Sequence, residues 1–260
     1  MFKASEAIAN ASAEQLPVEP PGSSPRKGGL VRVVLGGITG IAGAFLAWKS
    51  MGLIGQVATL PADLASLAFA AAPSPEQLQK VPAATLKVNQ QNAAIWLSAS
   101  GAILGCLFGL LVYFARRSAG SFLKLLVIPA IFGAAAGAAG GAVAVWINHV
   151  ARQNMGSGAT SPAEQIILGM HSATWLILGL GVGLGIAASR RAVGGSRLEA
   201  AVVTGVAAMV GGCLYPIIAG LFFVAVNSSF PIPHLEPAAA RILWLSLPSV
   251  LMGLAVGRNA

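Results

Sequence analysis

Three histidines carry the side chains best suited to binding a metal ion or moving a proton. His149, His171 and His234 are far apart in the sequence, and Glu164 and Glu236 are their nearest carboxylates. A neutral imidazole and a carboxylate can share a transition metal or relay a proton. No two of these histidines have the i and i+4 spacing of a helical metal motif. The sequence therefore favours polar residues at a membrane interface over a metal site.

A serine-based mechanism is the second chemistry to consider. The run Ser98-Ala99-Ser100-Gly101, with His171 two apolar stretches later, is similar to the serine and histidine arrangement of six-helix rhomboid proteases. In this chain Ser98 stands where that motif has its first glycine, and the order of the spans differs. Serines within helices commonly hydrogen-bond to their own backbone. The sequence also has no phosphate-binding loop or dinucleotide fingerprint, so we expect neither an enzyme nor a cofactor.

The elements that must position these residues are six apolar stretches without Asp, Glu, Lys or Arg. They cover residues 33–48, 93–115, 125–147, 166–188, 200–226 and 242–257. A chain of 260 residues with 56% hydrophobic and 9% charged residues cannot cover a water-soluble surface. About 20 apolar residues, in contrast, span a hydrocarbon core about 30 Å thick. The sequence therefore predicts an all-α polytopic membrane bundle of six transmembrane helices.

Two segments outside these stretches have their own character. Residues 1–25 contain three glutamates and four prolines and no apolar run, so we expect residues 1–28 to form a disordered cytoplasmic tail. Residues 29–260 then form the transmembrane domain, with a long outer loop near residues 53–92. Within this loop, Leu53, Val57, Leu60, Leu64 and Leu67 recur at helical spacing around a proline and predict short surface helices. Residues 73–92 are predicted to be a polar connection.

Basic residues flank the apolar stretches unequally. With a cytoplasmic N-terminus, eleven of the 16 Lys and Arg residues lie on the cytoplasmic side, which leaves Lys49, Lys80, Lys87, Arg152 and Arg241 outside. This bias predicts that both termini are cytoplasmic, with a bacterial inner membrane as the simplest location. Because the cations lie in short flanks that anionic lipid headgroups attract, the net charge of +8 implies no nucleic-acid partner.

The tryptophans follow the same orientation. Trp48 and Trp146 close the first and third stretches, Trp96 and Trp244 open the second and sixth, and Trp175 lies deeper in the fourth. All five therefore fall in the outer half of the bundle. Indole rings favour the headgroup boundary, so this placement predicts an aromatic belt on the outer side. The alternative is that some of these side chains fill gaps between helices, above all Trp175, which lies deepest.

Glycines recur at four-residue intervals in the second and third stretches. This spacing places small residues on one helix face and lets helices approach closely in lipid. It predicts helix packing through Gly101, Gly105, Gly109, Gly133, Gly137 and Gly141. The fourth stretch offers two such pairs, Gly179 with Gly183 or Gly181 with Gly185.

The chain also shows a faint internal repeat. A dibasic pair and a small-residue turn precede each odd-numbered stretch, and Trp96 and Trp244 are each followed by glycines nine and thirteen residues later. This plan is typical of three repeated helical hairpins about an axis along the membrane normal. Because the inner ends of spans attract Arg in any membrane protein, the pattern leaves open whether the hairpins are true repeats.

The spans lack the charged residue that usually marks a transport site. The sequence therefore favours a structural or accessory subunit of a membrane assembly, embedded in the lipid bilayer. Its partner would be a protein or a second copy, bound through the glycine-rich helices or the outer loop. The alternative is a transporter or channel for a small neutral solute, with a route lined by Thr39, Ser98, Ser100, Thr174, Thr204 and Tyr215.

Overall fold

The described part of the chain is helical and contains no strand. In the computed structural model it covers residues 27–69, 74–116, 121–155, 162–189, 197–223, 231–232 and 237–260. The helices are α2 (Lys27–Ile54), α3 (Ala62–Ala65), α4 (Pro75–Arg116), α5 (Phe122–Gln153), α6 (Glu164–Ser189), α7 (Arg197–Phe222) and α8 (Ala238–Asn259), and the 3-10 helix η1 (Ser66–Phe69) follows α3. The expected tail, residues 1–28, lies outside this part except for its last two residues, which begin α2.

Every α-helix except α3 is long and apolar enough to cross a membrane, which gives six spans. The prediction of a six-helix transmembrane bundle is thus confirmed. Most helices run past the apolar stretches, and α2 for example ends at Ile54 instead of residue 48. Helical hydrogen bonding continues into the flanks because long charged side chains can reach water from a helix end. Helix α7 differs, since it ends at Phe222 and not at residue 226.

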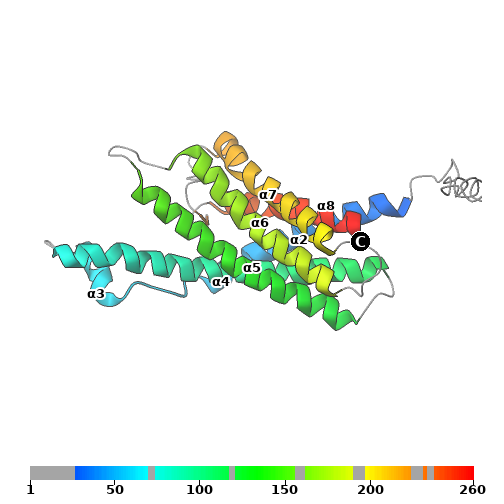
Figure 1. The fold of residues 1–260 in the computed structure, drawn as a ribbon, viewed down its shortest axis with the longest axis horizontal. Helices are drawn as coiled ribbons and strands as arrows, with labels where there is room; N and C mark the ends of the chain where they lie inside the picture. Colours follow the sequence, from blue (N-terminus) through cyan, green and yellow to red (C-terminus); the bar gives the residue numbers. More distant parts are fainter. Residues whose placement is uncertain are drawn as a thin grey trace, which may run out of the picture.

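Helix α4 departs most from the sequence-based expectation. Residues 75–92, predicted to be a polar connection, form its first turns. This segment is rich in Glu, Gln, Lys, Leu and Ala, which are strong helix formers, and Pro75 occupies the first position, where its ring is tolerated. With 42 residues α4 is about 63 Å long, about twice the thickness of the hydrocarbon core. Its first half therefore projects from the bundle, with α3 beside it (Figure 1).

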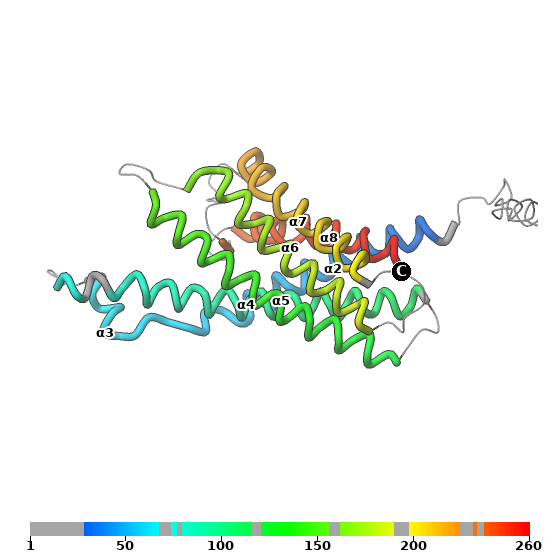
Figure 2. Tube along the Cα trace, in the orientation of Figure 1, coloured from blue at the N-terminus to red at the C-terminus, as the bar shows by residue number. Residues whose placement is uncertain are grey.

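The six spanning helices form a closed ring in chain order. Figure 2 shows the course of the chain from α2 to α8. Each helix packs against the next, and α8 packs against α2 to close the ring. Helices α4, α6 and α8 also contact one another, and their apolar windows are more buried than those of α2, α5 and α7. Inner and outer helices therefore alternate, as three hairpins would arrange them. A common origin for the hairpins stays a prediction.

Glycines bring α4 and α5 into backbone contact. Each of the six glycines singled out above meets the facing helix so closely that a Cβ would overlap its backbone: Gly101 with Gly133, Gly105 with Pro129, Gly109 with Leu125, Gly137 with Leu97 and Gly141 with Ala93. Any side chain at these positions would force the two helices apart. Because the contacts lie within one chain, this face is not available to a second copy.

Two further interfaces of the ring, α2 with α8 and α6 with α7, also contain close glycine contacts. Gly36 of α2 and Gly253 of α8 face each other, and Gly183 of α6 meets Ala201 of α7. Helix α6 uses both of its glycine pairs, one toward α7 and one toward α5: Gly179 and Gly183, and Gly181 and Gly185. Three alternate interfaces of the ring, α2 with α8, α4 with α5 and α6 with α7, therefore each bring two backbones together at glycines.

Apolar side chains fill the centre of the ring. Fully buried residues come from each inner helix and include Leu104, Phe108, Leu178, Val182, Leu245 and Met252. The outer helices instead expose large apolar side chains on their other face, such as Val34 and Ile38 of α2 and Val202 and Val206 of α7. An outward apolar face is stable in lipid and not in water. The six apolar helices therefore indicate an integral membrane protein.

The bundle has two ends that are formed by different parts of the helices. Gly257 of α8 meets the backbone of Arg32, so the start of α2 and the end of α8 lie at one end, near the marked C-terminus in Figure 1. We call this the compact end, and Lys124 and Arg258 also belong to it. The opposite, projecting end carries the first half of α4, α3 and the end of α5, with Lys87 and Arg152 among its cations.

Candidate functional site

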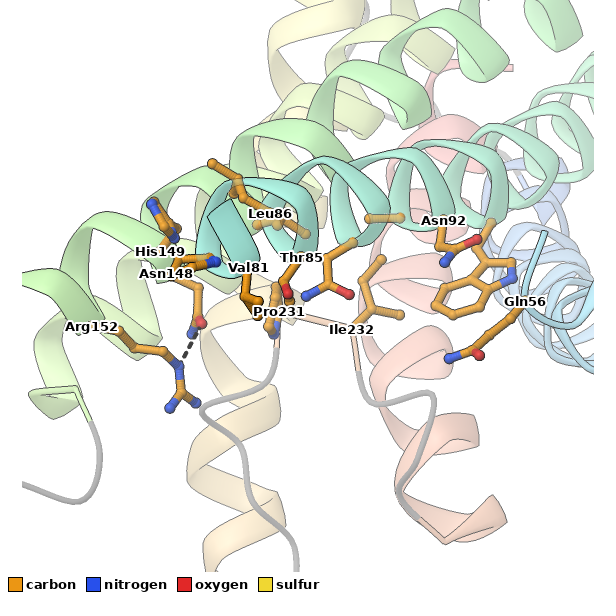
Figure 3. A pocket seen from close by; sticks show the side chains of 15 residues that line it. Gln56, Val81, Thr85, Leu86, Asn92, Asn148, His149, Arg152, Pro231 and Ile232 are labelled. Carbon is orange, nitrogen blue, oxygen red and sulfur yellow. Dashed lines mark hydrogen bonds between the residues drawn. The ribbon is translucent and has the colours of Figure 1, made fainter. Parts of the chain in front are cut away.

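A groove of about 600 Å³ lies at the projecting end (Figure 3). Four segments form its walls: the first half of α4, the last turns of α5, the segment after α2, and residues 231–232. We call it the outer groove, and it is bounded by Gln56, Leu86, Trp96, Asn148, Arg152 and Ile232. The groove exists because α4 begins as a helix at Pro75, well before its apolar part, and gives these segments a common support.

Two side chains of α4 fix one wall. Asn92 Oδ1 accepts the backbone N–H groups of Val57 and Ala58 at 3.0 and 2.8 Å, and Asn92 Nδ2 donates to the carbonyl of Ala58 at 2.9 Å. The indole N–H of Trp96 donates to the carbonyl of Gly55 at 2.6 Å. Asn92 and Trp96 are buried and lie one helical turn apart, so both face the same segment.

The chain turns sharply where this segment leaves α2. Gly55 has a φ of +61°, the left-handed conformation that glycine adopts at low cost at a helix C-terminus. Its N–H donates to the carbonyl of Met51 at 3.2 Å. The turn directs residues 56–58 along α4, where Asn92 and Trp96 hold them. This wall of the groove is therefore built by hydrogen bonds and not by apolar contact alone.

A cation marks the end of the groove farthest from the bundle. Arg152 Nε donates to Asn148 Oδ1 at 2.9 Å, one turn earlier on α5, and His149 lines the same end of the groove. Figure 3 shows these three side chains at one end of the groove, with Gln56 and Asn92 at the other. No Asp or Glu occurs among the described residues that line it.

The walls between these ends are mainly apolar. Val81, Leu86, Val145 and Ile232 line this stretch, together with the hydroxyl of Thr85. Apolar walls with a few polar groups at fixed positions are typical of small-molecule sites. The described lining suits a molecule with an apolar body and hydrogen-bonding groups at its ends.

A second polar cluster is enclosed within the bundle. His171 Nδ1 accepts the indole N–H of Trp244 at 3.1 Å. The imidazole packs edge-on against Tyr215 with ring centroids 5.1 Å apart, and Trp175 packs against Trp244 at 5.2 Å. All four side chains are 0% exposed. The hydrogen bond satisfies polar atoms that would be costly to bury alone, and the rings join α6, α7 and α8.

The three histidines considered as metal candidates have different surroundings. His149 lines the outer groove, whereas His171 is enclosed and uses Nδ1 to accept the bond from Trp244. His234 lies outside the described residues. Within the described ranges, no three His, Cys, Asp or Glu side chains form a group that could hold a metal ion. This arrangement lends the metal hypothesis no support.

The predicted aromatic belt is wrong for Trp96 and Trp244, and Trp175 follows the alternative of filling a gap between helices. Trp96, Trp175 and Trp244 are buried inside the bundle, while Trp146 is 55% exposed and Trp48 is half-buried. Position along the apolar stretch could not indicate which face of the helix each indole occupies. The indoles of Trp96 and Trp244 find hydrogen-bond acceptors within the protein and therefore need no headgroup.

Hydroxyl groups that the sequence suggested as the lining of a solute route form hydrogen bonds within their own helices. Each donates to the carbonyl four residues earlier, at 2.7 to 2.9 Å: Thr39, Ser100, Thr174 and Thr204. Such bonds satisfy the donor without a partner across the bundle. Of the other two residues, Tyr215 belongs to the aromatic cluster and Ser98 is half-buried on α4.

Sequence reasoning missed the roles of Asn92, Asn148 and Arg152. A usable signal was present, because Asn92 and Trp96, and likewise Asn148 and Arg152, have the i and i+4 spacing of one helix face. The polar half of α4 had to be recognised as helix before that spacing carried meaning. No family model matches the chain, and neither does any characterised protein or solved structure. Function must therefore be argued from these residues.

Proposed function

We propose that this chain is a structural or accessory subunit of a membrane assembly that binds a partner protein at its projecting end. The observation that carries the proposal is the contrast between the two parts of the molecule. The membrane-spanning part has an apolar centre and close glycine contacts, whereas α4 and α5 extend well past the bilayer core.

The bundle interior supports this role over transport. A transport route needs polar groups that face a common path, and charged groups usually mark it. Here Phe108, Val182 and Met252 help to fill the centre, and the hydroxyls of Ser100 and Thr174 are used within their own helices. The interior is therefore suited to holding a fixed shape.

The projecting end supports partner binding. Helix α5 has 32 residues and is about 48 Å long, so it too exceeds the bilayer core. Lys80 and Lys87 on α4 are exposed. The hydrogen bonds of Asn92 and Trp96 hold the segment after α2 in place. A rigid surface with exposed charge favours specific association, because little conformational entropy is lost on binding.

The proposal places the compact end in the cytoplasm of a bacterium and the projecting end outside its inner membrane. The support is the excess of basic residues around the compact end, where cytoplasmic cations are expected. Both termini would then be cytoplasmic, and the outer groove would open toward the opposite side. The proposal assigns no catalytic role to any residue.

Transport of a small neutral solute is the second candidate. One observation favours it: Ser249 Oγ and Trp175 Nε1 are buried in α8 and α6 without a hydrogen-bond partner in the described part of the chain. Such atoms are the places where a polar solute or water gains most from binding. Copurification from native membranes, together with solute flux in liposomes, separates the two functions.

A further inference from the structure

We propose that the core between α6, α7 and α8 is a binding site for internal water, which bridges buried side chains to backbone carbonyls that two prolines leave without a helical donor. Two independent observations carry the inference. Trp175 and Ser249 are buried polar side chains without a partner, and Pro216 and Pro248 interrupt the hydrogen bonding of the helices beside them. A scaffold and a transporter could each hold such water, so the inference does not depend on the proposed function.

The indole of Trp175 is the first side chain that needs a partner. Its ring is 0% exposed, and Nε1 has no hydrogen-bond acceptor in the described part of the chain. The buried indoles of Trp96 and Trp244, in contrast, donate to acceptors at 2.6 and 3.1 Å. The hydrocarbon core of a bilayer offers no water to such a group, and burial without a partner is costly. Trp175 therefore requires an acceptor that fits inside the bundle.

The hydroxyl of Ser249 is the second. Buried hydroxyls elsewhere in the bundle donate to the carbonyl four residues earlier, as Ser100, Thr174 and Thr204 do. Ser249 is also 0% exposed and lies inside α8, yet its Oγ has no partner among the described residues. Because the usual acceptor in its own helix is not used, this hydroxyl can bond to a bound molecule.

Two prolines supply acceptors in the neighbouring backbone. Pro216 of α7 and Pro248 of α8 lie inside their helices and have no N–H. The carbonyls four residues earlier, those of Gly212 and Trp244, therefore lack the donor that a regular helix provides. Ordered water is among the partners that satisfy such carbonyls in membrane helices.

Close helix contacts bring these groups to one level of the bundle. A Cβ built at Gly212 would lie 2.9 Å from Trp175 Cδ1, the ring atom bonded to Nε1. The N–H edge of the indole therefore borders the segment of α7 that carries the carbonyl released by its proline. The neighbouring Gly211 contacts the backbone of Pro248, and Ser249 follows directly. Donors and acceptors thus meet around one pair of glycines in α7.

The chemistry of this set suits water. The Trp175 indole can only donate, the two carbonyls can only accept, and the Ser249 hydroxyl can do both. A water molecule accepts from an indole while it donates to a carbonyl, and buried waters typically make about three hydrogen bonds. An ion would lack a counter-charge, because the buried residues in the described part of the chain include no Asp, Glu, Lys or Arg.

Solid-state NMR of the isotope-labelled full chain in lipid bilayers tests the proposal. We expect magnetisation to pass from water to the indole N–H of Trp175. The indole of Trp244 is the internal control, because it is equally buried and donates to His171. It should receive no magnetisation at the same mixing time.

A proline variant tests the bridging partner. Pro216→Ala restores an N–H that can bond to the carbonyl of Gly212, so the bridging water should lose an acceptor and the transfer to Trp175 should decrease. Pro82→Ala is the matched control, since Pro82 is an exposed proline inside the first half of α4. That variant should leave the transfer unchanged.

Unfolding temperatures test the second side chain without a spectroscopic assignment. Ser249→Ala should lower the unfolding temperature by about 2–4 °C, the effect of losing one net hydrogen bond in a chain of this size. Ser100→Ala is the control, because the Ser100 hydroxyl is equally buried but bonds to its own helix. It should change the unfolding temperature by less.

Several results would overturn the proposal. Equal transfer to the indoles of Trp175 and Trp244 would show general hydration of the bundle, and no transfer to either would show a dry core. A higher unfolding temperature for Ser249→Ala would mean that the hydroxyl is buried without water. A saturable shift of the Trp175 indole signal by glycerol, with loss of the water transfer, would assign the site to a neutral solute. None of these results depends on whether a partner protein copurifies.

Discussion

The indole N–H of Trp96 lies 2.6 Å from the carbonyl oxygen of Gly55, in a hydrogen bond between residues 41 positions apart. It joins the segment after α2 to α4, close to the place where α4 leaves the bundle. Asn92 adds three more hydrogen bonds one turn away. The projecting end is therefore attached to the membrane-spanning part by specific polar contacts, and these contacts can be tested individually.

Replacement of Asn92 by alanine should loosen this attachment. The backbone N–H groups of Val57 and Ala58 would lose their acceptor, and an intramolecular hydrogen bond contributes about 0.5–1.5 kcal/mol to stability. Hydrogen exchange measured by mass spectrometry should become faster at these two amides. Asn89→Ala, an exposed position on the same helix, should leave their exchange unchanged. Equal exchange in both variants would mean that the segment is held by other contacts.

A side chain at Gly105 should destabilise the bundle. Even the Cβ of alanine would overlap the Pro129 carbonyl, so α4 and α5 would have to move apart at a cost of about 1–3 kcal/mol or more. The unfolding temperature in detergent should fall for Gly105→Ala and fall further for Gly105→Leu. Gly220→Leu is the matched control, since a Cβ at Gly220 meets nothing within 4 Å. A Gly105→Leu protein as stable as Gly220→Leu would refute the packing role.

The bond between Trp244 and His171 should contribute to stability. Trp244→Phe removes the donor and leaves a buried imidazole nitrogen unsatisfied, at a cost of about 1–3 kcal/mol. Because the two residues share one interaction, His171→Phe combined with Trp244→Phe should cost less than the sum of the single changes. Trp146→Phe, at an exposed position, should change the unfolding temperature little. Additive losses would show that the two side chains contribute independently.

Sequence periodicity predicted the elements of the fold well and their faces poorly. Apolar length alone located all six spans, because lipid imposes that length on any helix that crosses it. It could not show that Trp96 and Trp244 face inward, since depth along a helix does not specify direction around it. The first half of α4 was predicted to be a polar connection, because the bilayer does not dictate the length of a polar segment.

The outer groove was beyond sequence reasoning for another reason. Its walls combine Gln56, Thr85, Asn148 and Ile232, which only the ring order of the helices brings together. The glycine positions were easier, because a four-residue repeat is a local property of one helix. Their partners, such as Pro129 opposite Gly105, depend on the register between helices and became visible only in the structure.

The orientation of the bundle is open to chemical labelling. In a background with both cysteines replaced, a Lys80→Cys variant should react with an impermeant maleimide applied to intact cells, whereas Arg258→Cys should react only after the membrane is opened. Both positions are exposed and lie at opposite ends of the bundle. The reverse pattern would place the projecting end in the cytoplasm and contradict the positive-inside assignment.

Reconstituted protein should not pass small neutral solutes. Since Thr174 donates its hydroxyl to Met170 on the same helix, Thr174→Val should alter neither flux nor assembly greatly. Liposomes that contain the protein should release glycerol or urea no faster than empty liposomes. Flux above that background, abolished by Thr174→Val or Tyr215→Phe, would support the transport alternative.

Copurification from native membranes tests the central claim most directly. Tagged wild-type protein, extracted in mild detergent, should carry a partner protein at a constant molar ratio through two different purification steps. Reversing the exposed charges with Lys80→Glu and Lys87→Glu should release that partner, while Lys124→Glu at the compact end should retain it. Purification of the wild type alone in every mild detergent, or equal retention of the partner by both variants, would contradict an accessory subunit that binds through its projecting end.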